Sequence, residues 1–246
     1  MAFFYIEQQA ICDGEIYIEG PLGFHLRRTL RCRIGERITV VDSSRNKYSV
    51  VITHLTPRGI RGEVEEVTPP PLDPGVEILL GQGIPKGKKF ETVLQKATEL
   101  GVGSIFPLFC ERSIVQFREK RIQHDMQRWQ NIVIEASQQS QRLAPPSLSQ
   151  PCSLELFLEN HLDFDLGLLL YEKEKKTGIR SYLRKKPIQK KVLILIGPEG
   201  GFSEKEVEGV VNKGFVSVSL GERVLRTETV GPFLVGLLQY EWGDIP

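Results

Sequence analysis

The proline-rich segment Thr68-Pro69-Pro70-Pro71-Leu72-Asp73-Pro74 divides this chain more sharply than any other feature. Each proline fixes φ and lacks an N–H donor, so the segment can join neither a helix nor a sheet ladder. We therefore expect two domains, covering residues 1–70 and 75–246. A chain of 246 residues is long enough to bury its cores without disulfides or structural metals.

The part before the prolines consists of short apolar runs separated by turn residues. Strands are expected at residues 3–6, 16–18, 37–41, 48–54 and 62–67. A single helix is expected at residues 23–30. This pattern favours a small β-barrel.

Strand and helix patterns alternate after the prolines. Buried strands are expected at residues 76–80, 104–109, 165–171, 192–196 and 215–220. Helices are expected at residues 88–100, 121–139, 203–213 and 230–242. Such alternation favours an α/β domain with a mainly parallel sheet, in which residues 141–152 form a connecting loop.

Cysteine and histidine are scattered, without a C-x-x-C pair or a histidine at ligand spacing. We therefore expect buried, reduced thiols at Cys12, Cys32, Cys110 and Cys152, and no metal site. No apolar run approaches the roughly 18 residues of a membrane span. The opening residues are typical of a strand rather than a signal peptide, so a cytoplasmic protein without membrane contact is expected.

The net charge of +1 conceals two basic blocks. Residues 27–37 contain five arginines against one acid, and residues 173–191 contain nine lysines and arginines against one acid. Such blocks suit a polyanion such as RNA. A solvated loop or helix face is the alternative for each block taken alone.

Two polar segments follow buried strands, where small-molecule sites form in α/β sheets. In Gly197-Pro198-Glu199-Gly200-Gly201, three glycines around an acid favour ligand contact over a simple turn. Ser203 and Glu206 then predict a capping box. In the second segment, residues 220–229, Thr227 or Thr229 is expected to cap the last helix.

Other small-molecule motifs are incomplete. The chain has no P-loop, and residues 81–87 (G-Q-G-I-P-K-G) miss the dinucleotide fingerprint by one position. A Rossmann cofactor is therefore disfavoured.

The motifs G-P-E-G-G-F-S at residues 197–203 and L-G-E-R-V-L-R-T-E-T at residues 220–229 resemble those of the ribosomal RNA small-subunit uridine-N3 methyltransferases, which are knotted SPOUT-class enzymes. Further matches occur in order at residues 25–31, 35–38, 86–91, 95–102, 111–113 and 135–140. The resemblance thus spans nearly the whole chain. Val230 departs from it, because alanine is usual there.

The resemblance implies an N-terminal PUA-like β-barrel that binds RNA and a C-terminal α/β methyltransferase domain with a trefoil knot. It implies S-adenosylmethionine as the cofactor. The cofactor-binding residues would be Leu170, Ile196, Gly197, Glu199, Gly200, Gly201, Leu220, Gly221, Leu225, Arg226, Thr227 and Thr229.

The implied activity is methylation of N3 of one uridine in 16S ribosomal RNA of the 30S subunit, by a homodimer. Arg226 is the candidate for stabilising charge on the uracil oxygens, and Glu228 or Glu199 is the candidate acceptor of the N3 proton. Helix capping or orientation of Arg226 is the alternative role of both glutamates. The candidate RNA-binding residues are Arg27, Arg28, Arg31, Lys86, Lys88 and Lys89.

Two other functions stay open from the sequence. One is a SPOUT methyltransferase acting on another RNA, because motifs around a cofactor do not identify the target base. The other is a non-catalytic RNA-binding protein of ribosome assembly that kept the fold.

Overall fold

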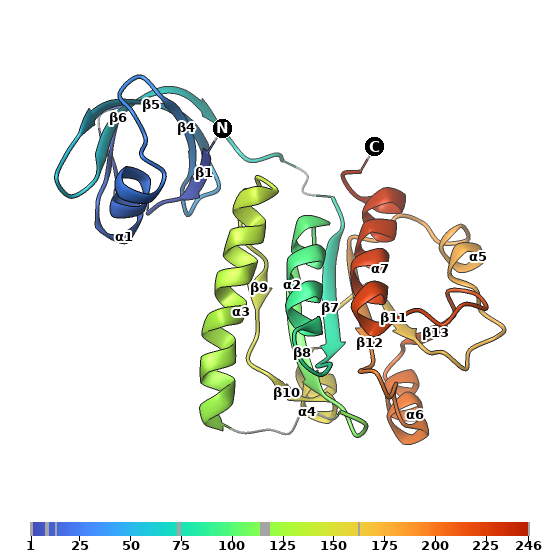
Figure 1. Ribbon diagram of the computed structural model, residues 1–246. Coiled ribbons are helices and arrows are strands. Elements are labelled where there is room, and N and C mark those ends of the chain that lie inside the picture. The colour runs from blue at the N-terminus through green and yellow to red at the C-terminus, as the bar shows by residue number, and fades with distance from the viewer. Residues whose placement is uncertain are drawn as a thin grey trace. The chain divides into compact units, whose positions relative to one another are not determined.

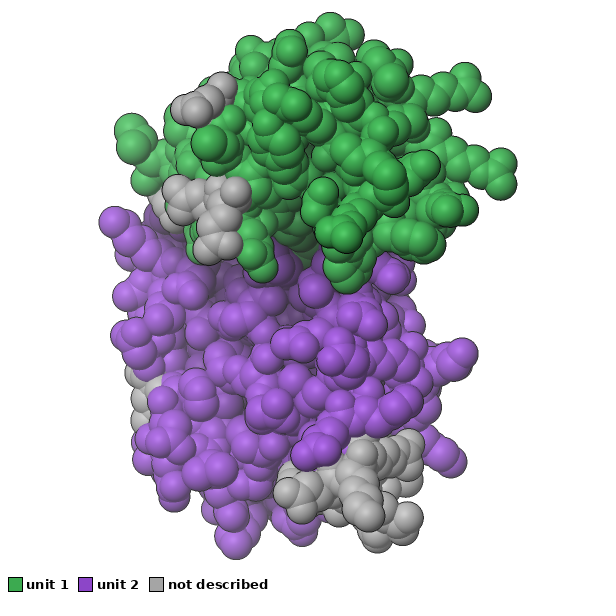
Figure 2. All heavy atoms as spheres, turned by 90° about the vertical axis from the view of Figure 1, so that its left-hand side faces the viewer, with its two compact units in different colours: residues 1–72, 137–144 green, residues 73–136, 145–246 purple. Residues whose placement is uncertain are grey.

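The computed structural model describes residues 2–7, 10–12, 14–72, 75–113, 119–161 and 163–245. The chain divides into two compact units, coloured separately in Figure 2. The first comprises Met1–Leu72 with Ser137–Ala144, and the second comprises Asp73–Ala136 with Pro145–Pro246.

A six-stranded mixed sheet in the order β1-β4-β5-β6-β3-β2 forms the first unit (Figure 1). Its strands are β1 (Ala2–Tyr5), β2 (Ile11–Cys12), β3 (Glu15–Ile18), β4 (Arg37–Val41), β5 (Lys47–Leu55) and β6 (Ile60–Thr68). Strands β1 and β4 run parallel, and the other neighbours run antiparallel. Within the described residues β1 and β2 do not pair, so the expected barrel is a curled sheet that stays open.

Alternating side chains of these strands form the core of the first unit. Ile38 and Val40 of β4 and Val50 and Ile52 of β5 are fully buried, as period-two strands with one covered face require. The expected helix starts earlier than predicted, as α1 (Gly20–Phe24), and continues as the π-helical turn η2 (His25–Thr29). Leu26 of η2 is buried against the sheet.

The segment Ser137–Ala144 belongs to the first unit although it is distant in sequence. The Tyr5 hydroxyl donates a hydrogen bond of 2.8 Å to the Arg142 carbonyl. Burial raises the pKa of Tyr5 to about 12. This tyrosine therefore stays a neutral donor across the physiological range.

The second unit is built on a seven-stranded, all-parallel sheet in the order β10-β8-β7-β12-β11-β13, with β9 paired to β8. Its strands are β7 (Glu77–Gly83), β8 (Ser104–Phe109), β9 (Ser147–Leu148), β10 (Cys152–Ser153), β11 (Leu166–Leu170), β12 (Lys191–Ile196) and β13 (Val216–Val218). Its helices are α2 (Lys89–Glu99), α3 (Glu119–Gln139), α4 (Leu154–Asn160), α5 (Ile179–Leu183), α6 (Glu204–Asn212) and α7 (Thr227–Trp242).

Helices cover both faces of this sheet, which is why its strands are continuously apolar. In β12, Ile194 and Ile196 face a core shared with α2, α3, α5 and α7. Leu193 and Leu195 face a second core shared with α4 and α6. The predicted α/β class with a parallel sheet is confirmed.

The four helices predicted in this part of the chain are present, within a few residues of their expected ends. Helices α4 and α5 were not predicted, because each is too short to show a clear helical period. Residues 141–152 were expected to be a loop only, yet they contain β9 and reach the start of β10 at the sheet edge.

Candidate functional site

A cavity of about 420 Å³ opens at the carboxyl ends of β11, β12 and β13. Three segments surround it, residues 170–172, 196–201 and 218–228, together with Lys89 and Val230. Because parallel strands place their carboxyl ends at one edge, segments distant in sequence meet there. The volume lies within the range of roughly 300–1,000 Å³ that is usual for small-molecule sites.

Almost every residue predicted to bind a cofactor lines this cavity. The lining includes Leu170, Ile196, Gly197, Glu199, Gly200, Gly201, Leu220, Gly221, Leu225, Arg226 and Thr227. Thr229 is not among the lining residues; its side chain is exposed in the first turn of α7. Val218, Ser219 and Val230 line the cavity without having been predicted, because they lie just outside the recognised motif.

The glycine positions of the loop after β12 leave little room for a side chain. Gly201 adopts a φ of 65°, and a Cβ atom there would lie 3.0 Å from Glu172 Oε1. A Cβ atom on Gly197 would lie 3.0 Å from the Gly201 carbonyl carbon. The backbone at this rim of the cavity is therefore bare, so a ligand can approach it closely.

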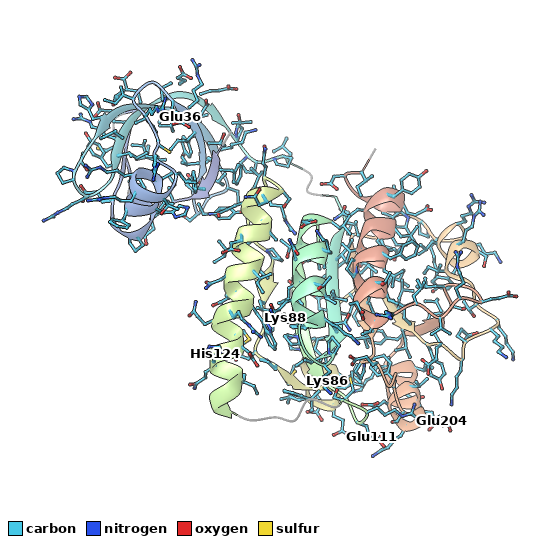
Figure 3. The ribbon with its side chains drawn as sticks, viewed as in Figure 1. Glu36, Lys86, Lys88, Glu111, His124 and Glu204 are labelled. Carbon is cyan, nitrogen blue, oxygen red and sulfur yellow. The ribbon has the colours of Figure 1, made fainter. Side chains whose placement is uncertain are left out.

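The predicted capping box fixes the end of this loop. Ser203 Oγ accepts from Glu206 N, and Glu206 Oε2 accepts from Ser203 N, at the start of α6. Glu206 Oε1 also accepts a hydrogen bond of 2.8 Å from Glu111 N. The same carboxylate thus attaches the chain after β8 to the start of α6. Figure 3 labels Glu111 and Glu204 at this end of the second unit.

Glu199 is held by the start of α2. Its carboxylate accepts from Lys86 N at 3.1 Å and from Lys89 Nζ at 2.8 Å. Burial opposes its ionisation, but these hydrogen bonds outweigh the burial and keep the pKa of Glu199 below its usual value. An acid with a lowered pKa is a poor proton acceptor near neutral pH, which favours the structural role of Glu199.

Gln82, at the carboxyl end of β7, is a residue that the sequence reasoning missed. Its buried Nε2 donates to the Gly83 carbonyl at 3.0 Å and to Thr227 Oγ1 at 2.9 Å, with a longer 3.4 Å contact to the Gly197 carbonyl. Two carbonyl acceptors fix the orientation of the amide, because its oxygen in that place would be repelled. The sequence did offer a signal for Gln82, because it is a polar residue within the otherwise apolar run of β7.

Thr227 does not cap the last helix, contrary to the prediction, and neither does Thr229. The N-cap of α7 is Arg226, and no side chain of the described residues caps it. The Thr227 hydroxyl instead donates to the Gly197 carbonyl at 2.6 Å. It thereby joins the start of α7 to the glycine loop, which a cap would not do.

Arg226 and Glu228 lie next to each other at the cavity. The Arg226 side chain is 82% exposed, and its Nη1 atom lies 3.8 Å from Glu228 Oε1. Glu228 is 17% exposed, and its buried Oε2 atom has no hydrogen-bond partner among the described residues. A buried carboxylate oxygen without a donor is an expected attachment point for a ligand.

The candidate RNA-binding residues fall on both units. Arg28 and Arg31 are exposed on the first unit and Arg27 is half-buried there. Lys86 and Lys88, labelled in Figure 3, are exposed between β7 and α2. Lys89 differs from them, because it forms a salt bridge with Glu199 and lines the cavity.

The thiols are less uniformly buried than expected. Cys32 and Cys110 are buried and Cys152 is half-buried, but Cys12 is exposed. Burial raises the pKa of the Cys110 thiol far above its usual value, so Cys110 is unreactive. The described residues contain no group of three potential metal ligands. Among those residues, no helix is both long and apolar enough to cross a membrane.

Comparisons with known proteins agree on one family. The model of the RNA methyltransferase domain matches residues 73–239. The chain is 28% identical over 244 residues to the ribosomal RNA small subunit methyltransferase E of Bacillus subtilis, covering 97% of this chain and 95% of that protein. The Synechocystis protein of the same name is 31% identical, with coverage of 91% and 72%.

Solved structures extend the similarity to the fold. A ribosomal RNA small subunit methyltransferase E from Neisseria gonorrhoeae, bound to S-adenosyl methionine, is similar with a TM-score of 0.86 and 28% identity over 100% of both chains. A Legionella pneumophila protein described as a methyltransferase, in complex with its cofactor SAM, has a TM-score of 0.81 and 32% identity over 96% of both chains.

Proposed function

This chain belongs to the ribosomal RNA small subunit methyltransferase E family, and from that premise we propose that it methylates a base of small-subunit ribosomal RNA with S-adenosylmethionine. The finer proposal is N3 of one uridine in 16S RNA. The observation that carries the proposed methyl transfer is the cavity, because the two motif segments and the end of β11 surround one space of about 420 Å³.

The cavity fits such a cofactor in three respects. Gly197, Gly200 and Gly201 line the cavity without side chains, so a ligand can approach their backbone closely. The buried Glu228 Oε2 atom lacks a protein donor among the described residues and can accept from a ligand hydroxyl or amine. Apolar walls, including Leu170, Ile196 and Val218, suit a flat heterocycle.

When bound, S-adenosylmethionine supplies the methyl group as a sulfonium. The protein must orient the uracil so that N3 lies in line with that methyl carbon, and such positioning is worth up to about 7–11 kcal/mol. The N3–C bond would form as the S–CH3 bond of the sulfonium breaks, with S-adenosylhomocysteine as the leaving group, and the proton on N3 must pass to a base of the protein. These two requirements define the tasks of the side chains at the cavity.

We assign the charge-stabilising task to Arg226 and the proton-accepting task to Glu228. The exposed guanidinium of Arg226 can reach the uracil oxygens, where negative charge develops as the proton leaves. Glu228 lies beside it with one carboxylate oxygen unpaired among the described residues. The alternative is that Glu228 only orients Arg226 and accepts no proton. Glu199 is not given the task, because hydrogen bonds lower its pKa.

We further propose that the enzyme is a homodimer that works in the cytoplasm on the 30S subunit. Phe233 and Tyr240, seven residues apart on one side of α7, are 48% and 64% exposed, and a partner copy would cover them. The trefoil knot belongs to the same proposal.

Nucleoside mapping by mass spectrometry tests the activity. Ribosomal RNA from cells lacking the gene should lack one N3-methyluridine of 16S RNA, and the purified protein should restore it. Loss of a methyl group elsewhere would indicate another RNA target. A calorimetric titration with S-adenosylmethionine that gives no heat would instead favour the non-catalytic assembly protein.

A further inference from the structure

The segment of residues 175–186 is the most cationic stretch of the second unit and has no role in the proposed chemistry. It contains six cations and no acid within twelve residues. All six are exposed, and among the described residues none forms a salt bridge. They are Lys175, Lys176, Arg180, Arg184, Lys185 and Lys186.

Several other cations of this unit are paired with acids. Lys96 bonds Glu99, Lys191 bonds Asp163, and Lys89 bonds Glu199. The acid before the segment, Glu174, accepts from the backbone N–H groups of Lys176 and Thr177, which lower its pKa and keep it ionised. Six cations and this single carboxylate leave residues 174–186 with a net charge of +5.

This basic segment is fixed directly to the rim of the cavity. Ser219, which lines the cavity, donates its N–H to the Thr177 carbonyl at 2.8 Å and accepts from Ile179 N at 2.9 Å. Ile179 and Leu183 of α5 are buried in the core, which turns Arg180 and Arg184 away from it. Figure 1 shows α5 on the same side of the second unit as β13.

We propose that the basic segment of residues 175–186 holds the phosphate backbone of the substrate RNA beside the methyl-donor cavity. This inference rests on the proposed function. A base can enter the cavity only if the phosphates on either side of it come close to the rim, where Ser219 anchors this segment. Lysine and arginine without acid partners are the side chains that bind such phosphates.

The test compares two charge-matched double variants. Arg180→Gln/Arg184→Gln removes two cations of the segment, and glutamine is a good helix former that preserves α5. Lys190→Gln/Lys213→Gln removes two exposed lysines before β12 and β13, at the amino-terminal edge of the sheet. Binding to a labelled transcript of small-subunit ribosomal RNA is measured over a range of salt concentrations.

For Arg180→Gln/Arg184→Gln we expect the salt slope of log K to fall by roughly 1.4 to 1.8, the value for two lost phosphate contacts. The KM for RNA should rise, with kcat and the calorimetric Kd for S-adenosylmethionine unchanged. Arg180→Lys/Arg184→Lys should restore the slope, because charge rather than shape is required.

The inference is wrong if both glutamine variants keep the wild-type salt slope, or if both lose the same amount of it. The proposed function would still stand in that case, provided that the wild-type enzyme methylates the RNA. A wild-type protein that transfers no methyl group to the RNA would overturn the proposed function, and the inference with it.

Discussion

Neighbouring residues at the candidate site differ in exposure and in role. Arg226 is exposed while Thr227, next in the chain, is buried and bonded to the Gly197 carbonyl. Because Thr227 holds the backbone there, the guanidinium of Arg226 is presented from a fixed point. Thr227 therefore has a structural role, and Arg226, the residue before it, has the proposed chemical role.

Arg226→Ala should therefore slow methyl transfer strongly while leaving cofactor binding nearly intact. Loss of one electrostatic contact to a developing negative charge costs about 10²–10³ in kcat. The Kd for S-adenosylmethionine should stay within several-fold, measured by calorimetry beside a methyl-transfer assay. Arg223→Ala is the control, since Arg223 is also exposed at the cavity. An Arg226→Ala enzyme with full activity would remove Arg226 from the mechanism.

Gln82→Leu should destabilise the second unit and weaken cofactor binding together. The substitution removes the bonds to the Gly83 carbonyl and Thr227 from a buried site, at a cost of about 1–3 kcal/mol. Urea denaturation measures the stability. Gln95→Leu, at an exposed position of α2, should change it by less than about 0.5 kcal/mol. If the two variants change the free energy of unfolding equally, the hydrogen bonds of Gln82 do not contribute to stability.

At the scale of elements, the site depends on how closely β7 approaches the loop after β12. A Cβ atom on Gly83 would lie 2.5 Å from the backbone nitrogen of Pro198, so the two segments touch with no space for a methyl group. By contrast, a Cβ atom on Gly209 in α6 would meet no atom of the described residues within 4 Å. Close packing therefore requires glycine at residue 83, whereas the space around residue 209 would accept a side chain.

Alanine at these positions should have effects of opposite sign. Gly83→Ala forces the backbone after β12 to move and should destabilise by about 1–3 kcal/mol, with weaker S-adenosylmethionine binding. Gly209→Ala should stabilise by about 0.5–1 kcal/mol, because glycine weakens a helix interior. Thermal denaturation with and without the cofactor distinguishes them. A stable, tightly binding Gly83→Ala protein would contradict the close contact.

The charge of the whole molecule is nearly balanced, but its cations differ in how they are paired. On the first unit, Arg28 is exposed and free of salt bridges among the described residues. Arg37, in the same basic block, forms two hydrogen bonds with Glu65, at 2.8 and 3.0 Å. Only unpaired cations can replace counterions on RNA.

Arg28→Gln should therefore weaken RNA binding and reduce its salt slope by about 0.7–0.9, while Arg37→Gln should leave the slope unchanged. Both variants lose one positive charge, so a difference between them reports pairing and not net charge. Filter binding at several salt concentrations measures it. If both slopes equal that of the wild type, the first unit does not hold RNA.

Local sequence patterns specify most of the elements and the segments that surround the candidate site. The helical period of residues 121–139, the apolar runs of β8 and β12, and the glycines of residues 197–201 are local patterns, encoded by residues a few positions apart. A capping box at Ser203 is equally local, and it was found. These features require no knowledge of distant contacts.

The tertiary structure decided which side chains meet. Gln82 and Thr227 are separated by 145 positions, and Lys89 and Glu199 by 110, so strand order and register alone bring each pair together. The same reason explains why Thr227 bonds Gly197 instead of capping α7, and why α5 lies beside Ser219. Periodicity specifies the face that a residue presents, but packing over the whole chain selects its partner.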